Sequence, residues 1–183
     1  MAARLLNLLL RLSIAYFLAE VVRSPNDRRF AGKAIPIRNL VIVGGLSLLF
    51  PAMHVTGKGK RWNSYPFGLD NVYLSIFSLD MAGNSFDLYD RYYYFDLIPH
   101  FHGTGSLVVA LRGALGLSAL SAIGLANMIH ILLEAQEYYT DVVFGTHNVR
   151  GVSDSVNDLL AGLAGTVCYG AASRLVEKPR ATR

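Results

Sequence analysis

The chain has 183 residues, of which 52% are hydrophobic and only 16% are charged. A mean hydropathy of +0.35 sets it apart from the average soluble domain and favours a small polytopic membrane protein. The net charge of +4 does not indicate nucleic-acid binding, because Lys and Arg cluster in short segments between and after apolar runs, as topology-setting loop charges do. A single cysteine, Cys168, excludes a disulfide framework.

Five apolar segments each approach the roughly 20 residues that a helix needs to cross a bilayer. They cover residues 5–22, 36–55, 92–111, 114–133 and 156–176. A sixth segment, 72–86, is shorter and contains Asp80 and Asn84, so we expect a short interfacial or re-entrant helix there. The prediction is an all-α, polytopic integral membrane bundle, with one transmembrane helical domain over residues 1–183 and a basic tail at 177–183.

The distribution of basic residues predicts the orientation. The connection after the first segment and the C-terminal tail are both rich in Lys and Arg, which is typical of cytoplasmic loops. If both are cytoplasmic, an even number of spans separates them, and the four strong spans satisfy this without segment 72–86. Lys58, Lys60 and Arg61 would then lie outside, against the charge rule. We expect a bacterial-type plasma (inner) membrane protein with a cytoplasmic tail.

Ionisable residues recur inside these apolar segments, where they normally face a protein interior or a water-filled cavity. From His130 the sequence HILLEAQEYYTD places His130, Glu134, Glu137 and Asp141 on one stripe of a helix. Imidazole and carboxylate groups on a buried face suit hard or borderline divalent cations. In the simpler interpretation, Glu137 and Asp141 are interfacial and only His130 and Glu134 are buried.

The last segment carries Asp154 and Asp158 on one helix face. The helix macrodipole favours acidic groups near the N-terminus, which explains Asp154 fully and Asp158 in part. Ala161, Gly162 and Gly165 follow, and small residues of this kind favour close helix packing in a membrane.

Asp96 and His100 are four residues apart in YYYFDLIPHFHGTGS, so they share one helix face. An aspartate one turn from a histidine can fix its tautomer, whether the histidine binds metal or handles protons, but a satisfied buried pair has the same spacing. His102 points about 160 degrees away from His100 on a regular helix and is expected to be a packing residue.

Three blocks of sequence together resemble a known family: LDMAGNSFDLYDRYYYFDLIPHFHGTGS, HILLEAQEYYTDVVFG and VSDSVNDLLAGLAGTV. They are similar to the YjdF-type bacterial inner-membrane proteins of unknown function and, more weakly, to the VanZ-like proteins linked to glycopeptide-antibiotic resistance. The matching residues are Asp96, His100, Phe101, Gly103, Glu134, Glu137, Asp154 and Asp158. The resemblance implies a bacterial-type polytopic membrane protein and transfers no reaction.

We predict an enzyme of the membrane interface that acts on a lipid or lipid-linked substrate with water activated by a divalent metal cation. Candidate metal ligands are His100, His130, Glu134, Glu137, Asp154 and Asp158, and the candidate catalytic residues are His100, Glu134 and Asp158. The alternative is a non-catalytic membrane protein, either a small proton- or cation-coupled carrier or an accessory subunit of a membrane complex. The expected partners are membrane lipid and a further subunit or second copy, but no nucleic acid.

Overall fold

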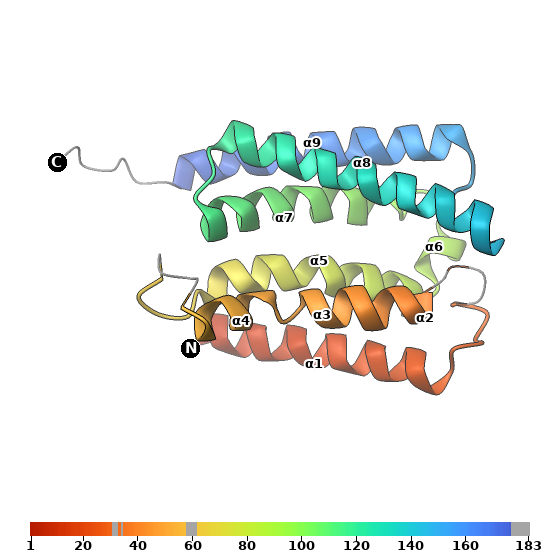
Figure 1. The fold of residues 1–183 in the computed structure, drawn as a ribbon, viewed down its shortest axis with the longest axis horizontal. Helices are drawn as coiled ribbons and strands as arrows, with labels where there is room; N and C mark the ends of the chain where they lie inside the picture. Colours follow the sequence, from red (N-terminus) through yellow and green to blue (C-terminus); the bar gives the residue numbers. More distant parts are fainter. Residues whose placement is uncertain (31–32, 34, 58–61, 177–183) are drawn as a thin grey trace.

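The structure, a computed structural model, describes residues 1–30, 33, 35–57 and 62–176. Its regular structure in this part of the chain is entirely helical, which confirms the all-α class. The helices form two layers (Figure 1). One layer holds α1 (Ala2–Arg23), the short segments α2 to α4, and α5 (Phe67–Ser85); the other holds α7 (Leu97–Leu115), α8 (Ala119–Phe144) and α9 (Val152–Val176), with the short α6 (Leu88–Arg91) between them.

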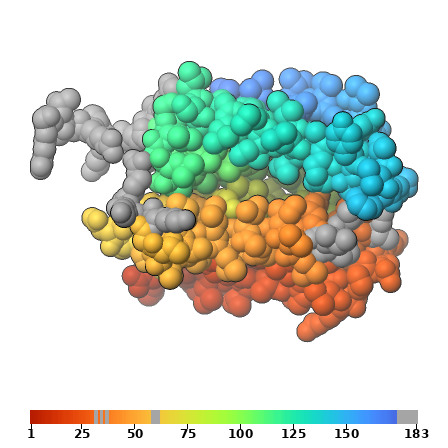
Figure 2. All heavy atoms as spheres, viewed as in Figure 1, coloured from red at the N-terminus to blue at the C-terminus, as the bar shows by residue number. Residues whose placement is uncertain are grey.

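Each layer has an apolar core of its own. In the first layer Phe17 of α1 packs with Leu74 and Met81 of α5. In the second layer Val108 of α7 packs with Ala122 and Ala126 of α8. Contacts between α5 and α7 join the layers, and the surface is hollowed between the α2–α4 segments and α8 (Figure 2).

The second apolar segment follows one path through the bundle but is broken into short pieces. These are α2 (Ile35–Arg38), the π-helical turn η1 (Asn39–Val43), α3 (Gly44–Leu46) and α4 (Leu49–Val55). Pro51 contributes to the break before α4, because proline has no N–H to donate to the carbonyl oxygen of Ser47. Arg11 of α1 replaces that donor, since its Nη1 donates to the Ser47 oxygen at 3.1 Å. The broken backbone is therefore satisfied from a neighbouring helix.

Arg11 also belongs to a buried polar cluster that joins α1 to the start of α5. Its Nη2 lies 2.6 Å from Oδ2 of Asp70, which is fully buried. The amide of Asn7 and the hydroxyl of Tyr65 donate to the same oxygen, at 2.8 Å and 2.5 Å. Burial and the hydrogen bond to Asp70 raise the pKa of Tyr65, so its hydroxyl stays protonated and can donate.

Helix α5 is longer than the short interfacial or re-entrant segment expected at residues 72–86. It has 19 residues and packs along α1 and α7. Its acidic residues have partners from other elements: Asp70 pairs with Arg11, and Asp80 lies 3.6 Å from Arg38 and accepts a hydrogen bond from Tyr89 at 2.9 Å. Because α5 runs the full length of the bundle, the connection after α1 and the end of α9 lie at opposite ends (Figure 1), not at the same end as the charges suggested.

Helices α7 and α9 run in the same direction and approach each other through glycine (Figure 1). A Cβ at Gly165 of α9 would overlap the carbonyl group of Phe101 on α7, and a Cβ at Gly105 of α7 would meet the ring of Tyr169 at 2.6 Å. The predicted close packing of small residues on the last helix is confirmed at Gly165. As a result, the N-terminal half of α7 lies beside the middle of α9.

Arg11→Met is expected to lower the free energy of unfolding by roughly 3–5 kcal/mol, because it leaves the buried Asp70 carboxylate without its cation. Denaturant unfolding of the purified protein in detergent measures the change. Arg28→Met is the control, since the Arg28 side chain is 83% exposed and its ion pair with Asp87 is expected to contribute less than about 1 kcal/mol. Equal losses in the two variants would contradict the structural role of Arg11.

Candidate metal centre

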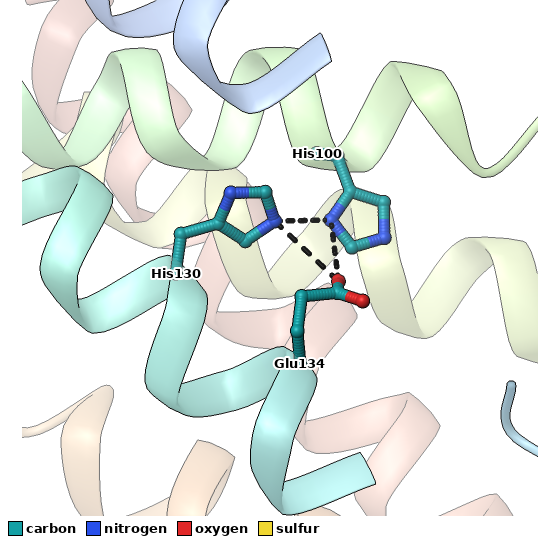
Figure 3. A group of neighbouring side chains, drawn as sticks. All are labelled: His100, His130 and Glu134. Atoms are coloured by element: carbon teal, nitrogen blue, oxygen red, sulfur yellow. Dashed lines mark hydrogen bonds and ion pairs between the residues drawn. The ribbon is translucent and has the colours of Figure 1, made fainter. Parts of the chain in front are cut away.

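His100, His130 and Glu134 lie together in the second layer (Figure 3). His100 comes from α7, and His130 and Glu134 are one turn apart on α8. His100 Nδ1 is 2.7 Å from His130 Nε2 and 3.6 Å from Glu134 Oε1, and His130 Nε2 is 3.5 Å from the same oxygen. The three ligand atoms therefore form a small triangle inside the bundle.

This triangle has the dimensions of a metal site. The point in its plane that is equidistant from the three atoms lies about 1.9 Å from each, and bonds from Zn²⁺ to imidazole nitrogen or carboxylate oxygen are roughly 2.0–2.2 Å long. The three atoms are therefore close enough together to bind one divalent ion. Two imidazoles and one carboxylate also leave a coordination position for water or substrate, as catalytic sites do.

The second nitrogen of His100 faces two further carboxylates. Nε2 lies 3.3 Å from Oδ1 of Asp96, one turn earlier on α7, and 3.8 Å from Oδ1 of Asp158 on α9. A proton on Nε2 that is shared with these carboxylates leaves the lone pair of Nδ1 free for a metal ion. Asp96 thus has the position that its spacing from His100 suggested, and Asp158 joins it from another helix.

Gly162 of α9 makes room for His130. A Cβ at Gly162 would overlap the imidazole ring at Nδ1 and Cε1. Next to it, the Thr104 hydroxyl of α7 donates to the Gly162 carbonyl oxygen at 2.8 Å, which links the two helices at this level. Nδ1 of His130 is buried and has no hydrogen-bond partner within the described part of the chain.

The cluster carries more negative than positive charge. Carboxylates of Asp96, Glu134 and Asp158 lie 3.3 to 3.8 Å from His100. In the regions that the structure describes, no Lys or Arg forms an ion pair with any of the three. A buried carboxylate without a cation is strongly destabilising, so a proton on His100 or a bound metal ion is needed to balance the charge.

Glu137 and Asp154, which the sequence also suggested as ligands, lie outside this arrangement. Glu137 Oε1 accepts a hydrogen bond from Nη1 of Arg38 at 3.0 Å. Asp154 Oδ2 accepts one from the backbone N–H of Arg150, also at 3.0 Å, at the start of α9. The macrodipole explanation of Asp154 therefore fits the structure better than a role as ligand.

Two other ionisable residues have local partners. His102 is on the side of α7 away from His100 and lies near hydroxyl groups of α5 and α9. Asp141 accepts hydrogen bonds from the backbone N–H groups of Asn148 and Val149, at 2.9 Å and 2.8 Å, and so holds the loop between α8 and α9.

Arg38 is the residue near the site that sequence analysis missed, because it was counted among the loop charges. It lies at the end of α2, donates to Glu137 of α8 and is paired with Asp80 of α5. It therefore bridges the two layers beside the His and carboxylate cluster. In the sequence, only the position of Arg38 in the first turn of the otherwise apolar segment 36–55 indicated that it could have a role near the site.

The fold and the cluster define the class as an all-helical bundle with a buried His and carboxylate site of metal-binding geometry. Comparison with protein-family models, curated proteins and solved structures found no significant match. The resemblance to the YjdF-type and VanZ-like proteins stays a prediction.

Gly162→Ala is expected to lower the free energy of unfolding by roughly 1–3 kcal/mol, because the added methyl group overpacks the His130 ring. In a His130→Ala background the same substitution should lose most of its effect. Unfolding of the four proteins in detergent measures this coupling. Gly124→Ala on α8 is the control, since nothing lies within 4 Å of its Cβ, and it should be neutral or stabilising. An unchanged effect without His130 would contradict the contact.

Proposed function

We propose that this chain is a polytopic membrane protein that binds a divalent metal ion at His100, His130 and Glu134 and uses it to hydrolyse or transfer a lipid or lipid-linked substrate. The triangle of ligand atoms carries the metal part of the proposal. Three protein ligands, an open coordination position and an unbalanced negative charge all favour a catalytic ion.

The surface of the bundle supports a membrane environment. Helices α1 and α8 are long and apolar enough to cross a membrane, and only 22% and 28% of their most apolar windows are buried within the protein. Most of their leucines, for example Leu9 of α1 and Leu132 of α8, therefore face outwards. Exposed apolar side chains continue on the other helices, for example Leu49 of α4 and Leu163 of α9. Surfaces of this extent on a single chain mark contact with lipid or another protein.

We infer six crossings, made by α1, the α2–α4 path, α5, α7, α8 and α9, in place of the five expected from hydropathy. The start of α1 and the end of α9 then lie on one side of the membrane (Figure 1). In the sequence, nine Lys and Arg residues belong to the helix ends and connections on this side: Arg4, Lys58, Lys60, Arg61, Arg112, Arg174, Lys178, Arg180 and Arg183. Of these, Lys58, Lys60, Arg61, Lys178, Arg180 and Arg183 lie outside the residues that the structure describes. At the other end Arg29 pairs with Glu20 and Asp27, and Lys33 with Asp90.

Seven Lys and Arg residues belong to the other end, against nine at the end with the C-terminal tail, so the count favours a cytoplasmic position for the tail and an external position for the α1–α2 connection. This orientation also agrees with the charge rule for Lys58, Lys60 and Arg61, which precede α5 in the sequence and lie outside the described residues. The metal centre is near the external end, because His100 is in the first turns of α7. Side-chain exposure rises from 4% for His130 to 20% for Asp96, so substrate would approach past Asp96.

His100, His130 and Glu134 would hold the ion, which would supply Lewis-acid chemistry by lowering the pKa of water and polarising an ester or phosphoester. The water oxygen forms the new bond to phosphorus or carbon, a neighbouring carboxylate takes up the proton, and the leaving oxygen is protonated as its bond breaks. His100 and Glu134 act as ligands. Asp96 and Asp158 hold His100 in its ligand orientation, a role that typically changes metal affinity by about 10- to 100-fold when it is lost.

Wild-type protein purified without chelators is expected to contain about one divalent metal ion per chain, as measured by inductively coupled plasma mass spectrometry. Glu134→Gln and His130→Ala should lose the ion, because each removes one of three ligands. Glu137→Gln is the matched control, since it changes a carboxylate one turn away on the same helix that pairs with Arg38. Circular dichroism checks that all variants fold.

A wild type that stays metal-free even after addition of Zn²⁺, Mn²⁺ or Fe²⁺ would overturn the metal site. Hydrolysis of phospholipid esters in vesicles should be lost with the metal in Glu134→Gln and kept in Glu137→Gln. Metal-dependent ion uptake into vesicles without any hydrolysis would contradict the enzyme and favour the carrier alternative.

Orientation is tested by labelling single cysteines in intact bacterial cells with a membrane-impermeant maleimide, in a Cys168→Ser background. The Asn26→Cys variant is expected to react, because residue 26 lies in the α1–α2 connection on the external side. The Ala2→Cys variant should react only after the cells are opened. The reverse pattern, or equal reaction at both positions, would contradict the proposed topology.

A further inference from the structure

A groove of about 620 Å³ lies between the two layers, on the side of α7 that faces away from the metal centre. Most of its wall is apolar and includes Leu79 of α5 together with Ile98 and Phe101 of α7. No Lys, Arg, Asp or Glu is among the described residues that line it. The groove therefore suits an uncharged, mainly hydrocarbon ligand.

Four polar side chains interrupt this apolar wall, and three of them are joined by hydrogen bonds. The fourth, Ser78, is hydrogen-bonded to the Ser13 hydroxyl of α1 at 2.6 Å. His102 Nδ1 is 2.8 Å from the hydroxyl of Tyr169 on α9, and His102 Nε2 is 2.9 Å from the hydroxyl of Ser75 on α5. The Ser75 hydroxyl also donates to the carbonyl oxygen of Val72 at 2.7 Å. One chain of hydrogen bonds thus crosses from α9 through α7 to α5 at the groove.

The two tautomers of His102 reverse the direction of donation along this series of hydrogen bonds. With the proton on Nε2, Tyr169 donates to His102, His102 to Ser75 and Ser75 to Val72, and the Tyr169 oxygen keeps a lone pair for an outside donor. With the proton on Nδ1, the donor to Nε2 is either Ser75, which then gives up its bond to Val72, or Ser106, whose hydroxyl lies 3.3 Å from Nε2. His102 then donates to Tyr169, so the Tyr169 hydroxyl proton is left for an outside acceptor. The network accommodates one further hydrogen bond of either direction.

We propose that this groove binds a neutral lipid-like molecule whose apolar chain lies along Leu79, Ile98 and Phe101 and whose hydroxyl or carbonyl group bonds to Tyr169. A phosphate or carboxylate headgroup is disfavoured, because its charge would be buried without a cation. The hydrogen bonds of His102 involve none of the metal-centre residues, so this site is independent of the proposed metal chemistry.

The test uses the full chain in detergent with a long-chain fatty alcohol that carries a diazirine, and the matched fatty acid as the charged probe. Photolabelling by the alcohol is expected on peptides of α5 and α7, with competition by unlabelled alcohol and at least about tenfold less labelling by the fatty acid, which corresponds to about 1.4 kcal/mol. Mass spectrometry locates the labelled residues.

Tyr169→Phe keeps the ring that packs against Gly105 but removes the hydroxyl. It should weaken competition by unlabelled alcohol about fivefold, the effect of losing one hydrogen bond of about 1 kcal/mol. Leu79→Trp fills the groove and should abolish labelling, whereas Leu163→Trp, on the exposed surface of α9, should leave it unchanged.

Labelling spread evenly over the lipid-facing helices, labelling that persists in Leu79→Trp, or equal labelling by the fatty acid would overturn the proposal. The metal content of Leu79→Trp distinguishes a failure of the groove proposal from a failure of the metal site. This variant should bind metal as the wild type does. Loss of metal in Leu79→Trp would contradict the independence of the two sites.

Discussion

The close contact between α7 and α9 is the constraint on which the candidate site depends. Gly165 lets the backbone of α9 lie against the Phe101 carbonyl, and Gly162 leaves space that the His130 ring fills. Larger side chains at either position would separate the helices or push the ring away. Since the two helices run in the same direction, their contact also brings Asp158 to His100, which lies near the start of α7.

Two buried polar clusters in this bundle differ in their balance of charge. Around Asp70, one carboxylate meets one guanidinium and two neutral donors, and Arg11 also satisfies the backbone that Pro51 leaves open. The charge in that cluster is balanced within the protein, as a structural role requires. Around His100, three carboxylates meet two imidazoles and no Arg or Lys within the described residues. Only the second cluster lacks a Lys or Arg partner among the described residues, so a proton on His100 or a bound metal ion has to balance its charge, and the proposed function rests on this cluster.

Spacing along one helix could be read from the sequence, but contacts between helices could not. The offsets from Asp96 to His100 and from His130 to Glu134 each place two groups on one helix face, and the structure has both pairs close together. The role of Glu137 depends on Arg38, which is 99 residues away along the chain. Segment 72–86 seemed too polar to cross the bundle because Arg38, the partner of its residue Asp80, also comes from a distant part of the chain. A hydropathy average includes the polar residues of this segment, but it carries no information about the residues on other helices that pair with them.

Helix α7 is the shared wall of the metal centre and the groove, because a step of two residues turns a helix by about 200 degrees and sends His100 and His102 to opposite sides. His102 bonds to hydroxyl groups of α5 and α9, so it fixes the rotation of α7 between its two neighbours. The same rotation sets the direction in which His100 presents Nδ1 to α8. The hydrogen bonds of His102 and the contacts of His100 therefore lie on opposite faces of one helix, and each face has partners of its own.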